Sequence, residues 1–343
     1  MNGHLAAKIF HHNPLKSDIP NYNKDAFQVF ADILYLMSLA NREGKIWLDG
    51  KLVDWREAKI HVLSHTLHYG TGIFEGVRCY ESKNGPAIFR LTAHTRRLFQ
   101  SAHILGIKIP FSEEEITSAQ CEIVHTNDFK SCYIRPLVFY GANTLGLGAT
   151  DNPVQVAIAA WPWGTYLGEE GLQKGIRVHT ATYARHHVNA AMCLAKATGY
   201  YVNSVLAHDE AAKNGYDEAL MLDVNGLVTE GPGENLFIVR NGKIITPALT
   251  SQLEGITRDT IIQLAADLGY DVIERAVTRD AVYTADEAFF TGTAAEVTPI
   301  RELDNRIIGN GGKGTITAAL QAAFFECVRG QHKRSPEWLT SVN

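Results

Sequence analysis

Cysteine is scarce in this chain, and the cysteines present form no recognisable pattern. Five are spread over 343 residues, and no two of them stand in a C-x-x-C pair. An odd number without paired spacing indicates neither a disulfide framework nor a zinc knuckle. This usage is typical of a reducing compartment, so we expect a cytoplasmic protein.

Long hydrophobic runs and blocks of a single charge are also missing. The longest apolar run, VQVAIAAWPW at 154–163, is about half as long as a membrane-spanning helix needs to be. The net charge of −5 comes from interspersed acids and bases, without a basic stripe that could follow a nucleic-acid backbone. We therefore expect neither a membrane nor a nucleic acid as a partner.

The length and the hydrophobic content of 45% are sufficient for about two domains with large cores. The first 36 residues contain no arginine, mix both charges and match no targeting signal. We expect Met37 to be the natural start of the protein. The expected divisions are an N-terminal extension at 1–44, a small α+β domain at 45–165, an interdomain loop at 166–174, a large domain at 175–331 and a C-terminal tail at 332–343.

Turn dipeptides between alternating apolar runs predict an antiparallel sheet in the first half. Asp49-Gly50 and Asn84-Gly85 are pairs that tight hairpin turns favour. The periodicity over 91–106 predicts a helix capped by Thr92, and strands are expected at 131–141 and 154–164.

The second half repeats these turns at Asn225-Gly226 and Asn241-Gly242. Helices are expected from about Ala197 to Lys213 and over 254–269. This order is α+β, not the regular βαβ alternation of a dinucleotide-binding fold.

Lys196 lies in an otherwise apolar window, AMCLAKATGYYV at 191–202, which offers no carboxylate to pair with it. An ammonium group loses hydration worth several kcal/mol in apolar surroundings unless a partner or a covalent bond offsets the loss. Lysine can then be deprotonated and serve as the amine that bonds to an aldehyde cofactor. The alternative is that its stem simply reaches water, and the window leaves both open.

Three further segments contain small residues next to polar ones. EGPGENLF at 230–237 places an acid before a tight turn, whereas EGITRDT at 254–260 and TGTAAE at 291–296 resemble anion sites. A helix N-terminus with small residues lets an anion approach unpaired N–H groups. A plain N-cap at Thr257 and a tight turn at Gly292 are the alternatives.

Taken in order, Lys196, Glu230, Ile256-Thr257 and Thr293 resemble the fold-type IV pyridoxal-phosphate enzymes, and among these the branched-chain amino acid aminotransferases. The resemblance extends from about residue 45 to about residue 330. Its matching segments include HTLHYGTGIFEGVRCY, CYIRPLVF, EGPGENLF, LEGITRD and FFTGTAAEVTPIRELD. Pro232 departs from the small residue that this family usually has. The resemblance implies a two-domain α+β architecture, similar to that of D-amino acid aminotransferase, with pyridoxal 5′-phosphate between the domains.

The resemblance also implies roles for individual residues. Lys196 would bond to the cofactor and move the proton between the substrate α-carbon and the cofactor. Glu230 would face the pyridine nitrogen, and Tyr201 would reach the phenolic oxygen, with Tyr200 as the alternative. The phosphate would be bound by Arg97, Ile256, Thr257 and Thr293.

On the substrate side, the resemblance implies an aromatic pocket with one cation. Arg135 would meet the side-chain carboxylate of glutamate, and the N–H groups of Thr293 and Ala294 would bind the α-carboxylate. Tyr69 would reach the pocket from a second subunit, which implies at least a homodimer. The remaining walls would be Phe74, Tyr133, Trp163 and Tyr166.

The implied activity is transfer of the amino group of L-leucine, L-isoleucine or L-valine to 2-oxoglutarate. D-amino acid aminotransferase and aminodeoxychorismate lyase share the fold, the lysine and the glutamate, but CYIRPL and FEGVRCY favour the branched-chain enzyme. A more distant alternative is a metal-dependent enzyme, because His61, His65 and His68 stand at helical spacing. No carboxylate accompanies these histidines at a fitting spacing, so we expect no metal there.

Overall fold

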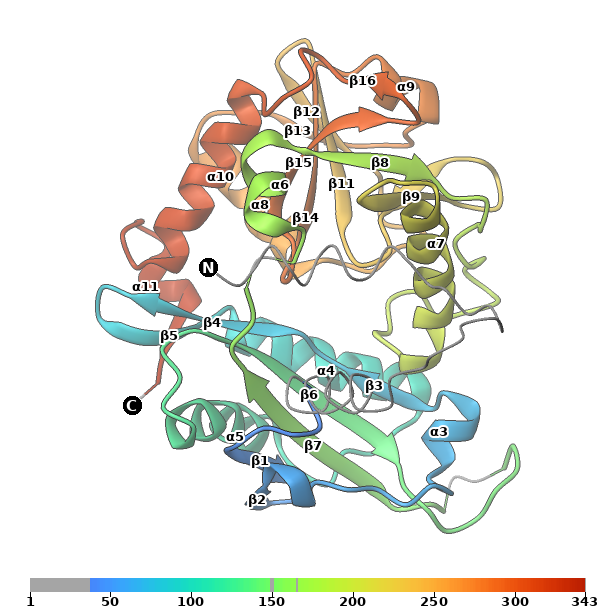
Figure 1. The fold of residues 1–343 in the computed structure, drawn as a ribbon, viewed down its shortest axis with the longest axis vertical. Coiled ribbons are helices and arrows are strands. Elements are labelled where there is room, and N and C mark those ends of the chain that lie inside the picture. Colours follow the sequence, from blue (N-terminus) through green and yellow to red (C-terminus); the bar gives the residue numbers. More distant parts are fainter. Residues whose placement is uncertain (1–37, 149–150, 165, 343) are drawn as a thin grey trace, which may run out of the picture. The chain divides into compact units, whose positions relative to one another are not determined.

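The computed structural model describes residues 38–148, 151–164 and 166–342. Gly44–Asn343 forms one compact unit that contains two β-sheets (Figure 1). Met37 and the residues before it lie outside the described residues. No helix in the described ranges is both long and apolar enough to cross a bilayer.

The first sheet is antiparallel, with strand order β17-β5-β4-β6-β7-β1-β2 and with β3 paired to β6. Asp49 and Gly50 both have positive φ, which the predicted hairpin turn requires. Helices α4 (Leu91–Leu105) and α5 (Glu113–Thr126) pack against this sheet around a shared apolar core. The strands are β1 (Lys45–Leu48), β2 (Lys51–Asp54), β3 (Gly72–Phe74), β4 (Val77–Ser82), β5 (Gly85–Phe89), β6 (Cys132–Tyr140), β7 (Val154–Trp161) and β17 (Leu339–Ser341).

The prediction that Thr92 caps the first long helix was wrong. The helix begins at Leu91, and its N-cap is Arg90 in the left-handed conformation. The Arg90 side chain pairs with Asp259 at 2.6 Å and lies over the Trp338 ring. These long-range contacts set the start of the helix, and the local sequence does not show them.

The second sheet is mixed, with strand order β10-β9-β8-β15-β14-β11-β12-β13. Because β10 also pairs with β11, six of its strands close into a ring. The short strand β16 pairs with β15. The strands are β8 (Ile176–Thr180), β9 (Glu218–Leu222), β10 (Val228–Glu230), β11 (Asn235–Arg240), β12 (Lys243–Thr246), β13 (Val272–Glu274), β14 (Glu287–Gly292), β15 (Glu296–Leu303) and β16 (Arg306–Ile307).

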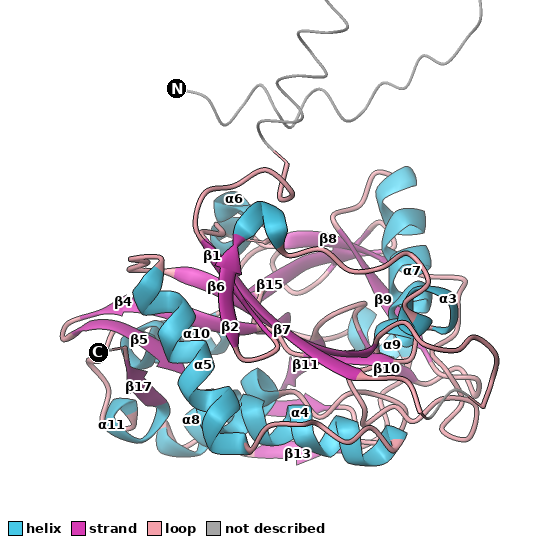
Figure 2. Cartoon of the chain, turned by 90° about the horizontal axis from the view of Figure 1, so that it is seen from below, coloured by secondary structure: helices cyan, strands magenta, loops and turns pink. Residues whose placement is uncertain are grey.

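Helices flank both sheets, as the view from below shows (Figure 2). In the segment predicted as the interdomain loop, residues 168–174 form a short helix, and the segment predicted as a C-terminal tail contributes α11 and β17. Strand β17 pairs with β5, so the end of the chain belongs to the first sheet. The helices not yet named are α3 (His65–Tyr69), α6 (Gly168–Lys174), α7 (Tyr201–Lys213), α8 (Ile256–Asp267), α9 (Arg279–Tyr283), α10 (Thr315–Val328) and α11 (Ser335–Trp338), with 3-10 turns η1 (Trp55–Glu57) and η2 (Thr198–Tyr200).

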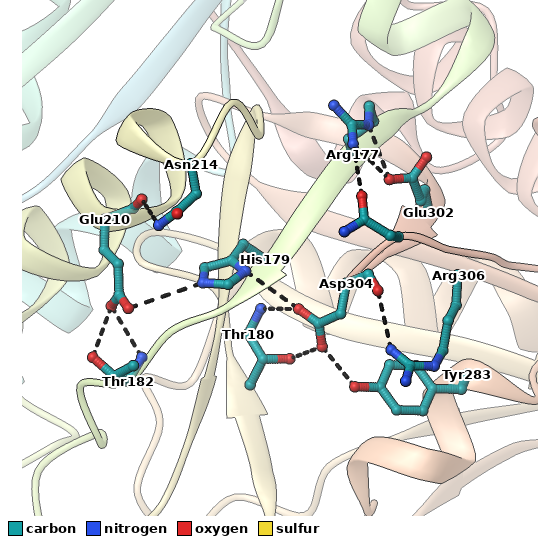
Figure 3. A network of polar contacts seen from close by, with 11 residues as sticks. Arg177, His179, Thr180, Thr182, Glu210, Asn214, Tyr283, Glu302, Asp304 and Arg306 are labelled. Carbon is teal, nitrogen blue, oxygen red and sulfur yellow. Dashed lines mark hydrogen bonds and ion pairs between the residues drawn. The ribbon is translucent and has the colours of Figure 1, made fainter.

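A polar network holds β8 to the turn between β15 and β16 (Figure 3). Asp304 accepts hydrogen bonds from the backbone and hydroxyl of Thr180 and from Tyr283, at 2.6 to 2.7 Å. Burial disfavours the charged carboxylate, but these hydrogen bonds outweigh it and lower the pKa of Asp304. Nearby, Arg177 of β8 pairs with Glu302 of β15 at 2.9 Å.

Candidate active site

A cavity of about 440 Å³ is lined by elements of both sheets. Every site residue expected from the sequence lines it, with the exception of Tyr69. Residues from β3, α4, β6, the end of β10, the start of α8 and the β14–β15 turn contribute. The structure therefore brings together segments that are separated by more than two hundred residues of sequence, such as Phe74 and Thr293.

The Lys196 backbone is attached to the first sheet. Its carbonyl accepts a hydrogen bond from Phe74 N–H at 3.0 Å, and its own N–H donates to Ser101 Oγ at 3.0 Å. Lys196 precedes η2 and α7, and it is partly buried. Its amine lies 2.7 Å from Tyr201 Oη and 5.0 Å from the centre of the Phe74 ring.

The structure distinguishes the two neighbouring tyrosines. Tyr201 lines the cavity and contacts the Lys196 amine, whereas the Tyr200 hydroxyl accepts a hydrogen bond from Met192 N–H at 3.3 Å. The expected helix from Ala197 begins as a 3-10 turn, and α7 starts only at Tyr201. Regular helical spacing from Lys196 therefore does not apply here.

Glu230 lies at the end of β10 with 4% of its surface exposed. Its Oε1 lies 2.8 Å from Arg185 Nε, although without hydrogen-bond geometry, and its Oε2 accepts from Leu253 N–H at 3.2 Å and from Asn235 at 3.4 Å. Burial raises the pKa of Glu230, while the Arg185 cation opposes this rise. The sequence reasoning missed Arg185, because nothing in its local sequence points to this long-range pair.

Arg97, the start of α8 and Thr293 also line the cavity. Arg97 donates to Glu75 Oε1 at 2.7 Å, to Glu75 Oε2 at 2.9 Å and to Glu254 O at 2.7 Å. Because a guanidinium has five N–H donors, two remain for an anion. Gly255 is the N-cap of α8, and a Cβ at this position would overlap the Asn235 amide oxygen. Ile256 and Thr257 follow in the first turn, where N–H groups have no partner within the helix.

Aromatic rings form another part of the cavity wall. Trp163 packs edge-on against Tyr133 at 4.5 Å and against Tyr166 at 5.9 Å between ring centres. Arg135 lies 4.7 Å from the centre of the Phe74 ring, and its buried Nε has no hydrogen-bond partner among the described residues. The cavity therefore combines apolar faces with a cation that has unused donors.

A glycine makes room for one of these rings. A Cβ at Gly76 would overlap the Tyr133 hydroxyl, so a side chain there would displace the ring from the cavity wall. FEGVRCY contains this glycine, although sequence reasoning gave it no role.

Glu234 is a cavity residue that sequence reasoning also missed, although it stands in the EGPGENLF segment. It is 4% exposed and accepts a hydrogen bond from Gly233 N–H at 3.0 Å. Burial and the nearby Glu218 carboxylate raise its pKa well above the ordinary value. The surroundings of Glu234 thus disfavour a negative charge at this point of the cavity wall.

Tyr69 lies outside the cavity, at the last position of α3, with 43% of its surface exposed. The alternative metal set nearby does not have the predicted helical arrangement, because α3 includes His65 and His68 but not His61. The ring nitrogens of His65 form hydrogen bonds with the Thr71 hydroxyl and with Gly146 O, and a ring nitrogen of His68 forms one with Val62 O. No group of three or more metal-ligating side chains occurs among the described residues.

The amino-transferase class IV family model matches residues 72–303, which is more than half of the chain. The chain belongs to this family. A branched-chain-amino-acid aminotransferase from Pseudomonas aeruginosa is 56% identical over 306 residues, covering 89% of this chain and all of that protein. The enzyme of the same name from Escherichia coli K12 is 45% identical over 300 residues, covering 87% of this chain and 97% of its own.

Solved structures agree with this assignment. The branched-chain amino acid aminotransferase of T.th., solved with pyridoxamine 5′-phosphate, has a TM-score of 0.86 and 50% identity, and the match covers 88% of this chain and 99% of that one. The Escherichia coli branched-chain enzyme has a TM-score of 0.85 and 44% identity over 88% and 100% of the two chains. The predicted α+β, fold-type IV architecture, the aminotransferase class and the pyridoxal-phosphate cofactor are confirmed.

The donor groups of this cavity fit that cofactor. An amine, a buried carboxylate with one oxygen that accepts no hydrogen bond, and an arginine beside a helix N-terminus line the same cavity. These are the groups that an aldehyde, a pyridine nitrogen and a phosphate need, respectively.

Proposed function

We propose that this protein transfers the amino group of L-leucine, L-isoleucine or L-valine to 2-oxoglutarate by a ping-pong mechanism. The observation that carries the proposal is that Arg135 and the Lys196 amine lie 4.7 and 5.0 Å, respectively, from the centre of the same Phe74 ring. An aliphatic side chain can pack on the aromatic faces, while a second carboxylate can bind the guanidinium. One pocket can thus accept both partners of the reaction.

When bound, pyridoxal phosphate supplies an aldehyde carbon and a ring that accepts electrons. Arg97, the N–H groups of Ile256 and Thr257, and Thr293 would hold the phosphate. Glu230 would hold a proton at the pyridine nitrogen, and its ion pair with Arg185 keeps the carboxylate oriented.

Lys196 would provide the covalent attachment and the base. Its free amine would be the base that moves a proton at the substrate α-carbon. The Tyr201 hydroxyl, at 2.7 Å, would hold this amine in place and donate to the phenolic oxygen of the cofactor.

The α-carboxylate is common to all substrates, and the N–H groups of Thr293 and Ala294 would bind it. Phe74, Tyr133, Trp163 and Tyr166 would surround an aliphatic side chain. Each methylene in such a pocket contributes about 1–3 kcal/mol to discrimination, so leucine, isoleucine and valine would be separated only weakly.

Two measurements on the purified protein test this proposal. We expect a yellow protein that loses its colour with L-leucine and regains it with 2-oxoglutarate, and Lys196→Ala should abolish both responses. Borohydride reduction and peptide mapping should label Lys196, whereas the exposed Lys174 serves as the unlabelled control. Label at another residue would refute the assignment of Lys196.

D-amino acid aminotransferase and aminodeoxychorismate lyase share the fold, and the relatives above bear the branched-chain name instead. Activity with D-alanine but none with L-leucine would reverse this choice.

We further propose that the protein works in the cytoplasm as at least a homodimer, with its cavity between domains 45–165 and 175–331. Tyr69 is exposed, and large apolar side chains near it are exposed as well, among them Val62 at 70% and Leu67 at 58%. A second copy of the chain would cover them and bring Tyr69 to the neighbouring cavity. Light scattering should give at least twice the mass of the chain, and an active monomer would refute the dimer.

A further inference from the structure

Glu296 occupies a backbone conformation that glycine usually takes. Three residues, Thr293 to Ala295, connect β14 to β15, and Glu296 follows with a φ of 56°. Residues other than glycine take a positive φ uncommonly, because their Cβ then crowds the neighbouring carbonyl oxygen. A glutamate here carries strain of about 1–3 kcal/mol, which persists only where surrounding contacts hold it.

The contacts that hold Glu296 come from the first sheet. Its Oε1 lies 2.7 Å from Arg78 Nη1 and accepts a hydrogen bond from Tyr80 Oη at 2.9 Å. The side chains of Glu296 and Arg78 are 6% and 9% exposed. Arg78 and Tyr80 belong to β4, whereas Glu296 begins β15, so this cluster joins the two sheets (Figure 1).

Arg78 also reaches a second part of the cavity wall. Its Nη2 donates to Gly164 O at 2.6 Å and to Trp163 O at 3.3 Å. The same guanidinium therefore holds the turn that contains Thr293 and Ala294 and the segment that carries Trp163. Both parts line the cavity.

We propose that Arg78 and Glu296 are positioning residues, which fix the Thr293–Ala294 turn and the Trp163–Gly164 segment at the distance that a substrate carboxylate needs. This inference rests on the proposed function, in which the turn binds the α-carboxylate. Neither side chain is among the residues that line the cavity, so both act through the groups that they hold. Because every substrate has an α-carboxylate, loss of the pair weakens the binding of all substrates alike.

The test uses the holoenzyme with Glu296→Gln, Arg78→Met and the double variant. KM should rise about tenfold, by the same factor for L-leucine, L-valine and L-glutamate. The reason is that a displaced Thr293–Ala294 turn loses about one charge-assisted hydrogen bond to the substrate α-carboxylate. The dissociation constant of 4-methylvalerate, which is leucine without its amine, should rise equally in calorimetry and does not depend on turnover.

The double variant separates positioning from stability. A single change leaves one buried charge unpaired and should lower the melting temperature, whereas removing both charges should restore much of it. KM and the dissociation constant should stay raised in the double variant, because no side chain then holds the Thr293–Ala294 turn in place. The matched control is Glu302→Gln. Glu302 lies on β15, as Glu296 does, but its ion pair with Arg177 is away from the cavity (Figure 3), so loss of this pair should leave KM unchanged.

Three outcomes would overturn the proposal: unchanged binding of 4-methylvalerate in the single variants, recovery of KM together with stability in the double variant, or a rise for one substrate only. If the wild-type protein does not use L-leucine, the proposed function fails instead. The same variants can then be compared on whichever amino acid the protein does use, because it too has an α-carboxylate.

Discussion

Replacing Glu75 by glutamine should weaken both the fold and cofactor binding. The Glu75 carboxylate is fully buried, and it accepts two hydrogen bonds from Arg97 and one from His94 Nδ1 at 2.8 Å. Burial alone disfavours the charged form, but the Arg97 cation and the His94 hydrogen bond hold the pKa of Glu75 well below its ordinary value. The pair therefore stays charged inside the protein.

Glutamine keeps the shape of the side chain but removes its charge and turns one acceptor into a donor. Arg97 then remains as a buried cation without its counter-charge, which costs about 3–5 kcal/mol. The amide keeps only one acceptor atom, so one of the two hydrogen bonds from Arg97 is lost outright, which by itself costs about 1.5–3 kcal/mol. Since the guanidinium is no longer held on two sides, its free donors should also bind phosphate less tightly.

Urea denaturation at pH 7, followed by tryptophan fluorescence at a fixed protein concentration, measures the first effect, and titration with pyridoxal phosphate measures the second. A pKa that is lower in the folded protein contributes stability above the unfolded value of 4.5, and this contribution is lost as the pH falls below it. The difference between wild type and Glu75→Gln should therefore shrink in acid. Glu57→Gln is the control, because Glu57 forms only an exposed pair with Lys59.

A decrease of less than about 1 kcal/mol in the free energy of unfolding of Glu75→Gln would refute the reasoning, because a buried cation that loses its counter-charge should destabilise the fold by more than this. An equal loss at pH 7 and below pH 4 would refute the electrostatic origin of the effect.

Three further predictions concern charged groups. Arg135→Met should raise KM for L-glutamate and 2-oxoglutarate about tenfold or more while KM for L-leucine changes little, as steady-state kinetics can show; equal changes would contradict its role. Hydrogen bonds from Arg334 lower the pKa of Asp267 from 3.8 to about 2. Asp267→Asn should therefore lower the free energy of unfolding by about 1–2 kcal/mol above pH 4, after allowance for solvent screening. In urea titrations this loss should vanish as the pH falls to about 2. Because the pKa of Glu234 is raised, wild type loses stability as the pH rises above 4.5; Glu234→Gln should be more stable at pH 7 but not at pH 4, and a variant less stable at both values would show that the carboxyl is needed in another way.

Local sequence was sufficient for much of the fold. Asp49-Gly50 predicted the first hairpin because few residues tolerate positive φ at both turn positions. The period of apolar residues predicted α8 to within a few residues of its bounds, Ile256–Asp267. The cap at Thr92 was predicted wrongly, since contacts of Arg90 with Asp259 and Trp338 decide where α4 begins.

The residues of the cavity also differ in whether the sequence alone points to them. Lys196 and Glu230 stand out within their own short segments, and the resemblance to a family gave each of them an expected role. By contrast, Arg185 beside Glu230 and Arg78 beside Glu296 come from distant strands or loops, and a single sequence does not show which charges meet.

The amino-acid sequence alone determined which reactive groups this protein carries, where its turns fall and which family it resembles. Only the tertiary structure decided which tyrosine meets the lysine, which cation faces Glu230 and that Tyr69 lies outside its own cavity. The physical reason is that turn and helix preferences act over a few residues, whereas a buried charge is matched by whichever partner the packing of two sheets brings within about 3 Å.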